Sequence, residues 1–354
     1  MSTFIQLHLL TSYPPSNLNR DDLGRPKTAV MGGKTRLRVS SQSLKRAWRT
    51  SDLFESALAG HIGTRTKKMG GEIYKNLLAK GVAEAKAKEF AKKIIEFFGA
   101  TEGEEKDKPL KELESSQLVH FNQSEIKGLT DLADKVAIDG KLDTEDLKNL
   151  VAKRYDADVS MFGRMLTGKE VVKVTNDPEA AVQVAHAITV HDVAVEDDYF
   201  TAVDDLNKGG DELGAAHIGE TEFAAGLFYL YLCINRDLLV ENLGGDKELA
   251  NKALGALIEA AAKVAPNGKQ NSFASRAYAS YVLAEKGEQQ PRSLSVAFLK
   301  PVRGEDILAK AISEIETRRA NMEKTYGPCA DDRKAMNAET GEGSLNDIIA
   351  FVKG

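Results

Sequence analysis

Residues 17–49 read NLNRDDLGRPKTAVMGGKTRLRVSSQSLKRAWR and hold nine Lys and Arg residues against only two acidic ones, Asp21 and Asp22. The whole chain of 354 residues nevertheless has a formal net charge of −5. Positive charge is therefore concentrated near the N-terminus, while the remaining residues are acidic on balance. A local excess of basic residues of this kind is typical of surfaces that hold anions, nucleic acids among them.

A strand followed by a helix is predicted where the charges are densest. In residues 34–39 the basic side chains of Lys34, Arg36 and Arg38 alternate with uncharged ones, which is the period of an extended strand with one basic face. Ser40 is a typical N-cap residue, so we expect a helix to begin there. Its predicted buried stripe is Leu44, Ala47, Trp48, Phe54 and Leu58, and its polar, mostly basic face is Gln42, Lys45, Arg46 and Arg49.

Three features of this stretch attract phosphate. The strand has a basic face, the start of the helix offers backbone N–H groups without helical partners, and the first turn carries basic side chains. Together they favour binding to a phosphodiester backbone. The alternative is a solvated surface, which is the usual fate of a charged run, and the coincidence of three features places the nucleic-acid hypothesis ahead of it.

Several motifs in this stretch connect the chain to a known family. NLNRDD, GGK and RVSSQSLKRA resemble the N-terminal signature of the CRISPR-associated backbone subunit of type I-E Cascade (the CasC type), and the resemblance covers residues 1–50, 158–235 and 268–285. It implies a protein that polymerises along a guide RNA (crRNA), has no nuclease role and consists of a palm, helical fingers and a protruding thumb. The implied partners are the guide RNA, target DNA through the guide, further copies head to tail and other Cascade subunits.

Composition limits the class of protein. With 42% hydrophobic residues, the chain is long enough for one large domain or two smaller ones. Cys233 and Cys329 are the only cysteines and form no CxxC motif, which argues for a reducing compartment and against a disulfide scaffold or a zinc cluster. The N-terminus lacks the features of a signal peptide, and no apolar run is long enough to cross a membrane. We therefore expect a cytoplasmic protein without membrane partners, cofactor or metal.

Hydrophobic periodicity predicts strands and helices along the whole chain. His8, in the first strand, is expected to be a hydrogen-bonded structural residue. The predicted strands cover residues 4–11, 34–39, 158–165, 181–193, 222–235 and 277–285. One predicted helix begins at Ser40, and the others cover residues 74–98, 125–136, 144–155, 249–264, 305–319 and 345–352.

The order of these elements predicts an α+β fold. Without residues 60–157 it reads β-α-β-β-α-β with one long arm, as in a ferredoxin-like (RRM-like) core, whose sheet is a common platform for single-stranded RNA. The predicted palm consists of residues 1–59, 158–192 and 223–354, of which the first part carries the basic strand and helix. Residues 60–157 are the predicted helical fingers insertion, and residues 193–222 the thumb hairpin.

The predicted thumb is acidic, with Lys208 as its single basic residue. Its charge is unsuited to phosphate, but Tyr199, Phe200, Thr201, His217 and Ile218 could wedge against bases, and stacking contributes ~1–3 kcal/mol per base. YFTAVDDL and AHIG resemble the family's thumb, which favours the wedge over a Phe200 packed in its own core. An acidic thumb also complements the basic palm of another copy, and such a heterologous contact generates helical filaments when it does not close.

Two further motifs receive roles only through the resemblance. The family has a Gly-Arg-Met on its RNA face, so Arg164 is assigned to a phosphate and Met165 to a base. Residues 268–271 (GKQN) form a polar loop whose role is open between RNA and the neighbouring subunit. The full set of expected RNA contacts is Asn19, Arg20, Lys27, Lys34, Arg36, Arg38, Ser40, Gln42, Lys45, Arg46, Arg49, Arg164, Met165, Tyr199, Phe200, Thr201, His217 and Ile218.

Catalytic alternatives receive little support from the sequence. Residues 32–35 (GGKT) resemble the end of a Walker A motif, but position 28 is Thr28 rather than glycine, and a strand is predicted where the motif needs a helix. His186 and His191 would lie on opposite faces of a strand and could not share a metal. We expect a non-catalytic RNA-binding subunit. The alternatives are a metal-dependent ribonuclease that uses Asp21 or Asp22 and a stand-alone RNA-binding protein.

Overall fold

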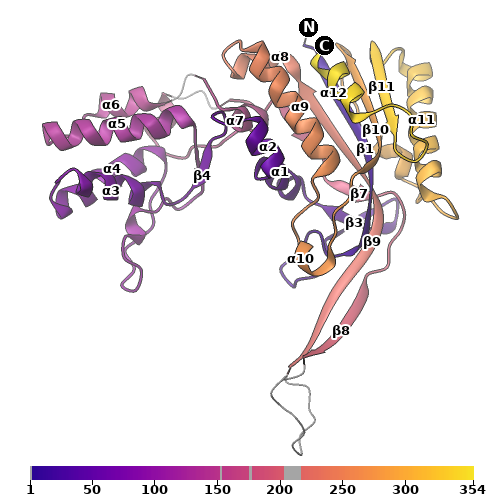
Figure 1. The fold of residues 1–354 in the computed structure, drawn as a ribbon, viewed down its shortest axis with the longest axis horizontal. Coiled ribbons are helices and arrows are strands. Elements are labelled where there is room, and N and C mark those ends of the chain that lie inside the picture. Colours follow the sequence, from indigo (N-terminus) through magenta and orange to yellow (C-terminus); the bar gives the residue numbers. More distant parts are fainter. Residues whose placement is uncertain (1, 152–153, 175–177, 203–216) are drawn as a thin grey trace, which may run out of the picture. The chain divides into compact units, whose positions relative to one another are not determined.

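The computed structural model describes residues 2–151, 154–174, 178–202 and 217–354 (Figure 1). The chain divides into two compact units. The sheet unit comprises residues 1–54, 183–235 and 254–354, and the helical unit comprises residues 55–182 and 236–253. The helical unit thus contains all of residues 60–157, the predicted insertion, together with residues that flank it on both sides.

A large, mainly antiparallel sheet organises the sheet unit. Its strand order is β11-β10-β1-β9-β7-β3-β2, and β6 and β8 also pair with β9. The strands are β1 (Phe4–Ser16), β2 (Thr28–Met31), β3 (Lys34–Val39), β6 (Val182–Val184), β7 (Ala187–Thr189), β8 (Glu196–Ala202), β9 (His217–Asn235), β10 (Ala279–Gly287) and β11 (Asp332–Asn337). With the helices around it, this sheet confirms the α+β class.

Helices are distributed over both units. The chain before the insertion contributes α1 (Ser41–Arg49) and α2 (Asp52–Ala57). The helices nearer the C-terminus are α9 (Lys247–Lys263), α10 (Gln270–Phe273), the 3-10 helix η3 (Ser295–Phe298), α11 (Ile307–Tyr326) and α12 (Leu345–Lys353). The helical unit contains α3 (Met69–Ala79), α4 (Glu84–Phe98), α5 (Gln123–Asp139), α6 (Thr144–Leu150), α7 (Ala157–Phe162) and α8 (Arg236–Asn242), the short strands β4 (Thr64–Thr66) and β5 (Val119–Phe121), and the 3-10 helices η1 (Lys111–Leu113) and η2 (Val171–Lys173).

Some predicted elements differ from those observed. Residues 158–165 were predicted as a strand but fall mostly in the helix α7, because a short apolar run fits either element and the buried Asp158 accepts the backbone N–H of Val159 at the start of this helix. The strand predicted over residues 181–193 is interrupted between β6 and β7 at Ala185 and His186. The helix predicted over residues 74–98 is two helices, α3 and α4, and the one predicted over 144–155 ends at Leu150.

Both faces of the sheet are covered. Ile5, Leu7 and Leu9 of β1 are buried on one face. On the other face, Leu10 lies opposite Tyr229 and Tyr281. These three residues form one apolar cluster with residues from the segment 294–315, including Leu294, Phe298 and Ile315. The face that an RRM-like sheet would offer to RNA is therefore filled, over its centre, by the chain's own C-terminal segment.

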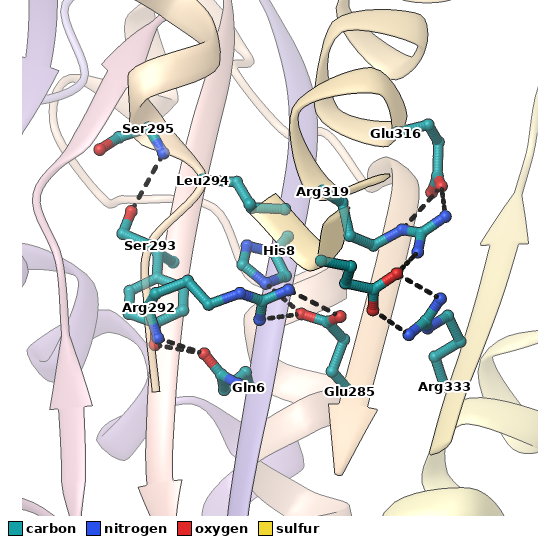
Figure 2. Close-up of polar contacts among 12 residues, drawn as sticks. Gln6, His8, Glu285, Arg292, Ser293, Leu294, Ser295, Glu316, Arg319 and Arg333 are labelled. Carbon is teal, nitrogen blue, oxygen red and sulfur yellow. Dashed lines mark hydrogen bonds and ion pairs between the residues drawn. The ribbon is translucent and has the colours of Figure 1, made fainter. Parts of the chain in front are cut away.

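A polar network lies within this covered face (Figure 2). The buried Glu285 of β10 accepts hydrogen bonds from Arg292 at 2.5 and 3.0 Å and lies 3.3 Å from Nε2 of His8. The hydroxyl of Tyr229 lies 2.8 Å from Nδ1 of His8. The prediction that His8 is a hydrogen-bonded structural residue is confirmed.

The network also sets the ionisation of its members. Burial alone would raise the pKa of Glu285, but hydrogen bonds from His8 and Arg292 outweigh it and lower the pKa to about 2. Burial lowers the pKa of His8 despite the nearby carboxylate, so the imidazole is neutral. These groups therefore hold the covering segment to the sheet through one carboxylate that stays charged.

The strand β9 reaches from the centre of the sheet into a projecting hairpin. Residues 226–235 pair with β1, and residues 217–223 pair with β8. Figure 1 shows the β8–β9 hairpin extending beyond the other strands of the sheet unit. This hairpin occupies the region predicted to be the thumb.

Candidate nucleic-acid interface

The loop before β2 is tied to the start of α1. Asn19 accepts a hydrogen bond from the backbone N–H of Ser40 at 2.9 Å, and its carbonyl accepts one from Lys27 at 2.8 Å. The carboxylate of Asp21 accepts the backbone N–H groups of Leu23 and Arg25, both at 2.9 Å. Because Asp21 closes its own turn, the loop holds a fixed shape next to the helix.

Asn17 connects the same loop to the base of the hairpin. Its side chain is buried and donates to the carbonyls of Gly24 at 2.9 Å and Glu222 at 3.0 Å. Arg25 adds an ion pair to the Glu222 carboxylate at 3.0 Å. The chain before α1 is thereby linked to β9 at the point where the hairpin leaves the sheet.

Residues Gly32 and Gly33 form a two-residue turn between β2 and β3. Both have positive φ (60° and 72°), as a tight hairpin turn between paired strands requires. Lys34 begins a strand and not a helix, so the rejection of a Walker A motif agrees with the observed backbone. A Cβ at Gly32 would lie 1.7 Å from the carbonyl oxygen of Leu299, so this turn also packs closely against the segment after η3.

The basic face predicted for β3 is only partly exposed. Lys34 is exposed and Arg38 is half-buried, but Arg36 is fully buried. Its guanidinium donates to the carbonyls of Thr189 and Phe298, both at 2.9 Å. The carbonyl of Phe298 covers this part of the strand, which argues against the predicted contact of Arg36 with a nucleic acid.

The helix α1 begins as predicted. The hydroxyl of Ser40 caps it by accepting the N–H of Ser43 at 3.3 Å. The predicted stripe is confirmed, with Leu44, Ala47, Trp48, Phe54 and Leu58 all buried. The helix ends earlier than expected, at Arg49, because Ser51 accepts the N–H of Phe54 and starts the separate helix α2.

The polar face of α1 lies outside the core. Gln42 and Arg46 are exposed, and Lys45 and Arg49 are half-buried. Desolvation lowers the pKa of Lys45. A partly desolvated ammonium gains more from a bound anion than a fully hydrated one does, because its interaction with the anion is less screened.

Two adjoining pockets lie beside this helix, and Arg46 of its polar face lines the first of them. The first has a volume of about 450 Å³ and is lined by Leu18, Asn19, Arg20, Asp21, Asp22, Gly24, Ser43, Arg46, Ala47, Asn267 and Gly268. The second, of about 650 Å³, shares Ala47 and Asn267 with it and continues to Lys263, Arg276 and the 67% exposed Tyr278. Together they make a polar groove that could follow an extended strand of nucleic acid.

The loop of residues 268–271 belongs to this groove. A Cβ at Gly268 would lie 2.2 Å from the carbonyl oxygen of Leu18, so only glycine permits the approach of the two segments. Lys269 donates a hydrogen bond to the hydroxyl of Thr221 near the base of the hairpin. The polar loop noted in the sequence therefore packs against the N-terminal motif.

Arg164, in the helical unit, is not available as predicted. Its guanidinium donates to both oxygens of Glu125, at 2.6 and 2.9 Å, and neither side chain is exposed. The buried pair satisfies the charge of Arg164 within the unit, which argues against the predicted phosphate contact. Met165 is 70% exposed, and its assignment to a base stays a prediction.

The hairpin presents aromatic side chains outside any core. Tyr199 and Phe200 are 65% and 45% exposed, and Thr201 is also exposed. The ring of Phe200 lies across from Gly219, where a Cβ would come within 2.4 Å of its Cζ. His217 and Ile218 are the first residues of β9 and pair with Ala202 and Thr201. The described acidic residues here are Glu196, Asp197, Asp198, Glu220 and Glu222, while Asp204, Asp205, Lys208, Asp211 and Glu212 lie outside the described residues.

Several residues at this interface were missed by the sequence reasoning. Lys263, the last residue of α9, and Arg276 and Tyr278 from the loop before β10 line the groove, and the two loop residues give no periodic signal. His186 was considered only as a metal ligand, yet Arg38 donates to its Nδ1 at 2.9 Å.

The part of the chain that the structure describes contains neither a cluster of metal ligands nor a membrane span. Within these residues, no three His, Cys, Asp or Glu side chains are grouped so that they could hold a metal ion. Among the described helices, none combines the length and apolarity that a membrane span requires.

Comparisons with known proteins identify the family. The model of the CT1975-like protein family matches residues 5–349. A chain from a "CRISPR RNA-guided surveillance complex, pre-nicking" has a similar structure, with a TM-score of 0.81, 32% identity and coverage of 97% of this chain and 94% of that chain. A chain from a "CRISPR RNA-guided surveillance complex" matches with a TM-score of 0.75 and 26% identity, covering 99% of both chains. No curated protein matches at a significant level. The chain belongs to the CT1975-like protein family, and its structure is similar to those of subunits of CRISPR surveillance complexes.

Proposed function

We propose that this protein is a guide-RNA-binding backbone subunit of a type I-E CRISPR Cascade complex. Several copies line one guide and present its bases for pairing with target DNA, in a cytoplasmic ribonucleoprotein that also contains other Cascade subunits. Sequence recognition then belongs to base pairing, and the protein contacts backbone and shape. The observation that carries the proposal is the convergence of the loop at Asn19 and Arg20 with Arg46 of α1 on one open groove, beside the half-buried Lys45 and Arg49 of the same helix.

The arrangement of the sheet supports an RRM-like palm. Along the chain, β1, β7, β9 and β10 are separated by helices at the positions of a β-α-β-β-α-β unit, with α1 after β1 and α9 after β9. In the sheet they run β10-β1-β9-β7, which is the order 4-1-3-2 of a ferredoxin-like core. Since the centre of one face is covered by the C-terminal segment, we place the RNA along α1 and the adjoining end of the sheet.

The hairpin supports a repeated assembly. Its exposed Tyr199 and Phe200 lie outside the core, on strands rich in carboxylates. Carboxylates repel phosphate but attract the basic groove of another copy. We infer that the hairpin of each copy docks on the palm of the next, where its aromatic residues separate bases of the bound guide.

The proposal is tested by the RNA affinity of a double variant, Lys45→Ala with Arg49→Ala, measured at several salt concentrations. Each lost phosphate contact to a single strand should remove ~0.7 from the slope of log K against log salt, equally for unrelated RNA sequences. The exposed Lys324 and Lys334, changed to Ala together, give a control with the same change of charge. Equal losses in both double variants, or a loss for one RNA sequence only, would contradict backbone recognition by α1.

A non-catalytic role forms part of the proposal. The carboxylate of Asp21 is engaged by two backbone N–H groups, which supports a structural use of this residue. We expect labelled RNA to stay intact with Mg²⁺ or Mn²⁺. Cleavage by the parent that disappears in Asp21→Ala or Asp22→Ala would establish the ribonuclease alternative instead.

A stand-alone RNA-binding protein is the third candidate. Light scattering with RNAs of increasing length separates it from a backbone subunit. The backbone subunit should add copies in steps as the RNA lengthens, whereas a stand-alone protein should keep one stoichiometry per site. The other subunits that copurify with the guide-loaded assembly test the type I-E assignment.

A further inference from the structure

His186 occupies a position that the sequence analysis left without a role. It is exposed, lies directly before β7 and receives a hydrogen bond from Nη1 of Arg38, which lies 2.9 Å from its Nδ1. Arg38 is on β3, where its backbone N–H donates to the carbonyl of Lys27 at 2.8 Å. Arg38 and His186 are thus in contact, and the backbone of Lys27 pairs with that of Arg38 close enough for the Lys27 charge to act on the ring.

The hydrogen bond fixes the state of the imidazole. A guanidinium has only donors, so Nδ1 of His186 must accept, and the ring proton is then on Nε2. His186 is neutral in this state and offers Nε2–H as a donor. If the ring takes up a second proton, Nδ1 also becomes a donor and can no longer accept from Arg38.

The surrounding charges oppose that second proton. Desolvation, followed by the positive charges of Arg38 and Lys27, lowers the pKa of His186. Among the described residues, the charged groups that act on this ring are these two cations, from the segment before β2 and from β3. An anion bound between the three side chains would remove the repulsion and favour protonation.

We propose that Lys27, Arg38 and His186 form a phosphate subsite in which binding of a phosphodiester and protonation of His186 occur together. The inference rests on the proposed function and adds a titratable residue to it. When the phosphate binds, the ring becomes an imidazolium, and its Nδ1 stops accepting the hydrogen bond from Arg38. The guanidinium is then free to turn to the phosphate oxygens. One proton is taken up for each subsite that is filled.

The neighbouring His191 is used differently. Its Nε2 accepts the backbone N–H of Leu227 at 3.1 Å, and its Nδ1 lies 2.9 Å from the carbonyl oxygen of Asp192. Both ring nitrogens of His191 therefore hold the backbone around β7. His191 is therefore a structural histidine, whereas His186, five residues earlier, is exposed and keeps Nε2–H as a donor.

The pH dependence of RNA binding tests the subsite. Affinity for a uridine oligomer is measured between pH 8 and 5.5 at constant ionic strength for the parent, His186→Gln and His186→Lys. His61→Gln, in which another exposed histidine is changed, is the control. The parent and the control should bind more tightly as the pH falls, by up to about tenfold for each unit by which RNA raises the pKa of His186. His186→Gln should lose this increase, and His186→Lys should bind at pH 8 as the parent does at low pH.

The outcomes separate the subsite from the proposed function. If His186→Gln keeps the pH slope of the parent while Lys45→Ala with Arg49→Ala weakens binding, the subsite is overturned and RNA binding stands. If the parent does not bind the oligomer at all, both fail. A proton uptake that is the same in the parent and His186→Gln, measured by calorimetry in buffers of different ionisation enthalpy, would also overturn the subsite.

Discussion

Arg36 and Arg38 lie two residues apart on one strand, yet they belong to different parts of the molecule. Arg36 lies under the covered face of the sheet, where the carbonyls of Thr189 and Phe298 take its donors. Arg38 lies where the cover ends and donates to an exposed histidine. In the first region the polar groups are hydrogen-bonded within the chain, whereas in the second they lie at the surface, where another molecule can reach them. Charge in the sequence therefore marks a nucleic-acid surface only where the chain does not supply the acceptor itself.

The largest expected effect comes from breaking the network in the covered region. Glu285→Ala leaves Arg292 and His8 without their carboxylate, and removing one partner of a buried ion pair costs about 3–5 kcal/mol. Urea unfolding of the RNA-free protein measures this loss. Glu288 is exposed and three residues away, so Glu288→Ala should change stability by less than ~0.5 kcal/mol. Similar values for the two variants would mean that the network does not hold the cover.

The same network should make the protein sensitive to acid. The folded pKa of Glu285, about 2, lies below the ordinary value of 4.5, so its stabilisation is complete above pH 4.5 and is lost as the pH falls toward 2. The change amounts to about 3 kcal/mol. The lowered pKa of His8 acts in the same direction below pH 6.5. Melting temperatures from pH 7 to 2.5 should fall more steeply for the parent than for Glu285→Gln, and parallel curves would contradict the charged network.

Arg36→Ala and Arg38→Ala compare the two regions directly. Arg36→Ala removes two buried hydrogen bonds from a charged donor and should cost about 2–3 kcal/mol. Arg38→Ala should cost less than ~0.5 kcal/mol but weaken RNA binding. Denaturation and RNA titration of both variants check this. A stable Arg36→Ala variant that has lost RNA affinity would instead support a contact between Arg36 and RNA.

The smallest effect on stability is expected in the hairpin. Phe200 is 45% exposed, so Phe200→Ala should change the stability of the RNA-free protein by less than ~0.5 kcal/mol. In the assembly, the same change should expose the guide to nuclease at regular intervals. Tyr326→Ala removes an aromatic ring that is more exposed and lies on α11, and it should leave the footprint unchanged. A large drop in melting temperature for Phe200→Ala would place the ring in the core and contradict the wedge.

Elements with strong hydrophobic periodicity were predicted correctly from the sequence. β1, β3 and β9 and the buried stripe of α1 are recognisable because alternation or helical spacing reports directly on which side chains face a core. The rejection of a Walker A motif at residues 32–35 relied on the same alternation in residues 34–39, but the strand β2 and its hairpin turn to β3 were not predicted. The short apolar run in α7 was not predicted correctly either, since local periodicity does not distinguish a helix of six residues from a strand.

Burial of charged residues could not be predicted in the same way. Nothing in residues 34–39 indicates that Phe298 lies over Arg36, because the two are 262 positions apart in the sequence. Arg164 paired with Glu125 is a similar case in the helical unit. The resemblance to the family assigned roles by motif, but the acceptors that satisfy these two guanidinium groups come from distant segments, which no local pattern reveals.

The continuity of β9 has a mechanical consequence. At ~3.3 Å per residue, its nineteen residues span about 60 Å from the middle of the sheet to the hairpin. No hinge separates the part that pairs with β1 from the part that pairs with β8, because one strand backbone runs through both. The seven residues that pair with β8 project ~23 Å at this rise per residue, so a change of ~5° in the direction of the strand where it leaves the sheet would move the far end by ~2 Å. Substitutions deep in the sheet, far from any nucleotide, should thus alter the pitch at which successive copies are spaced.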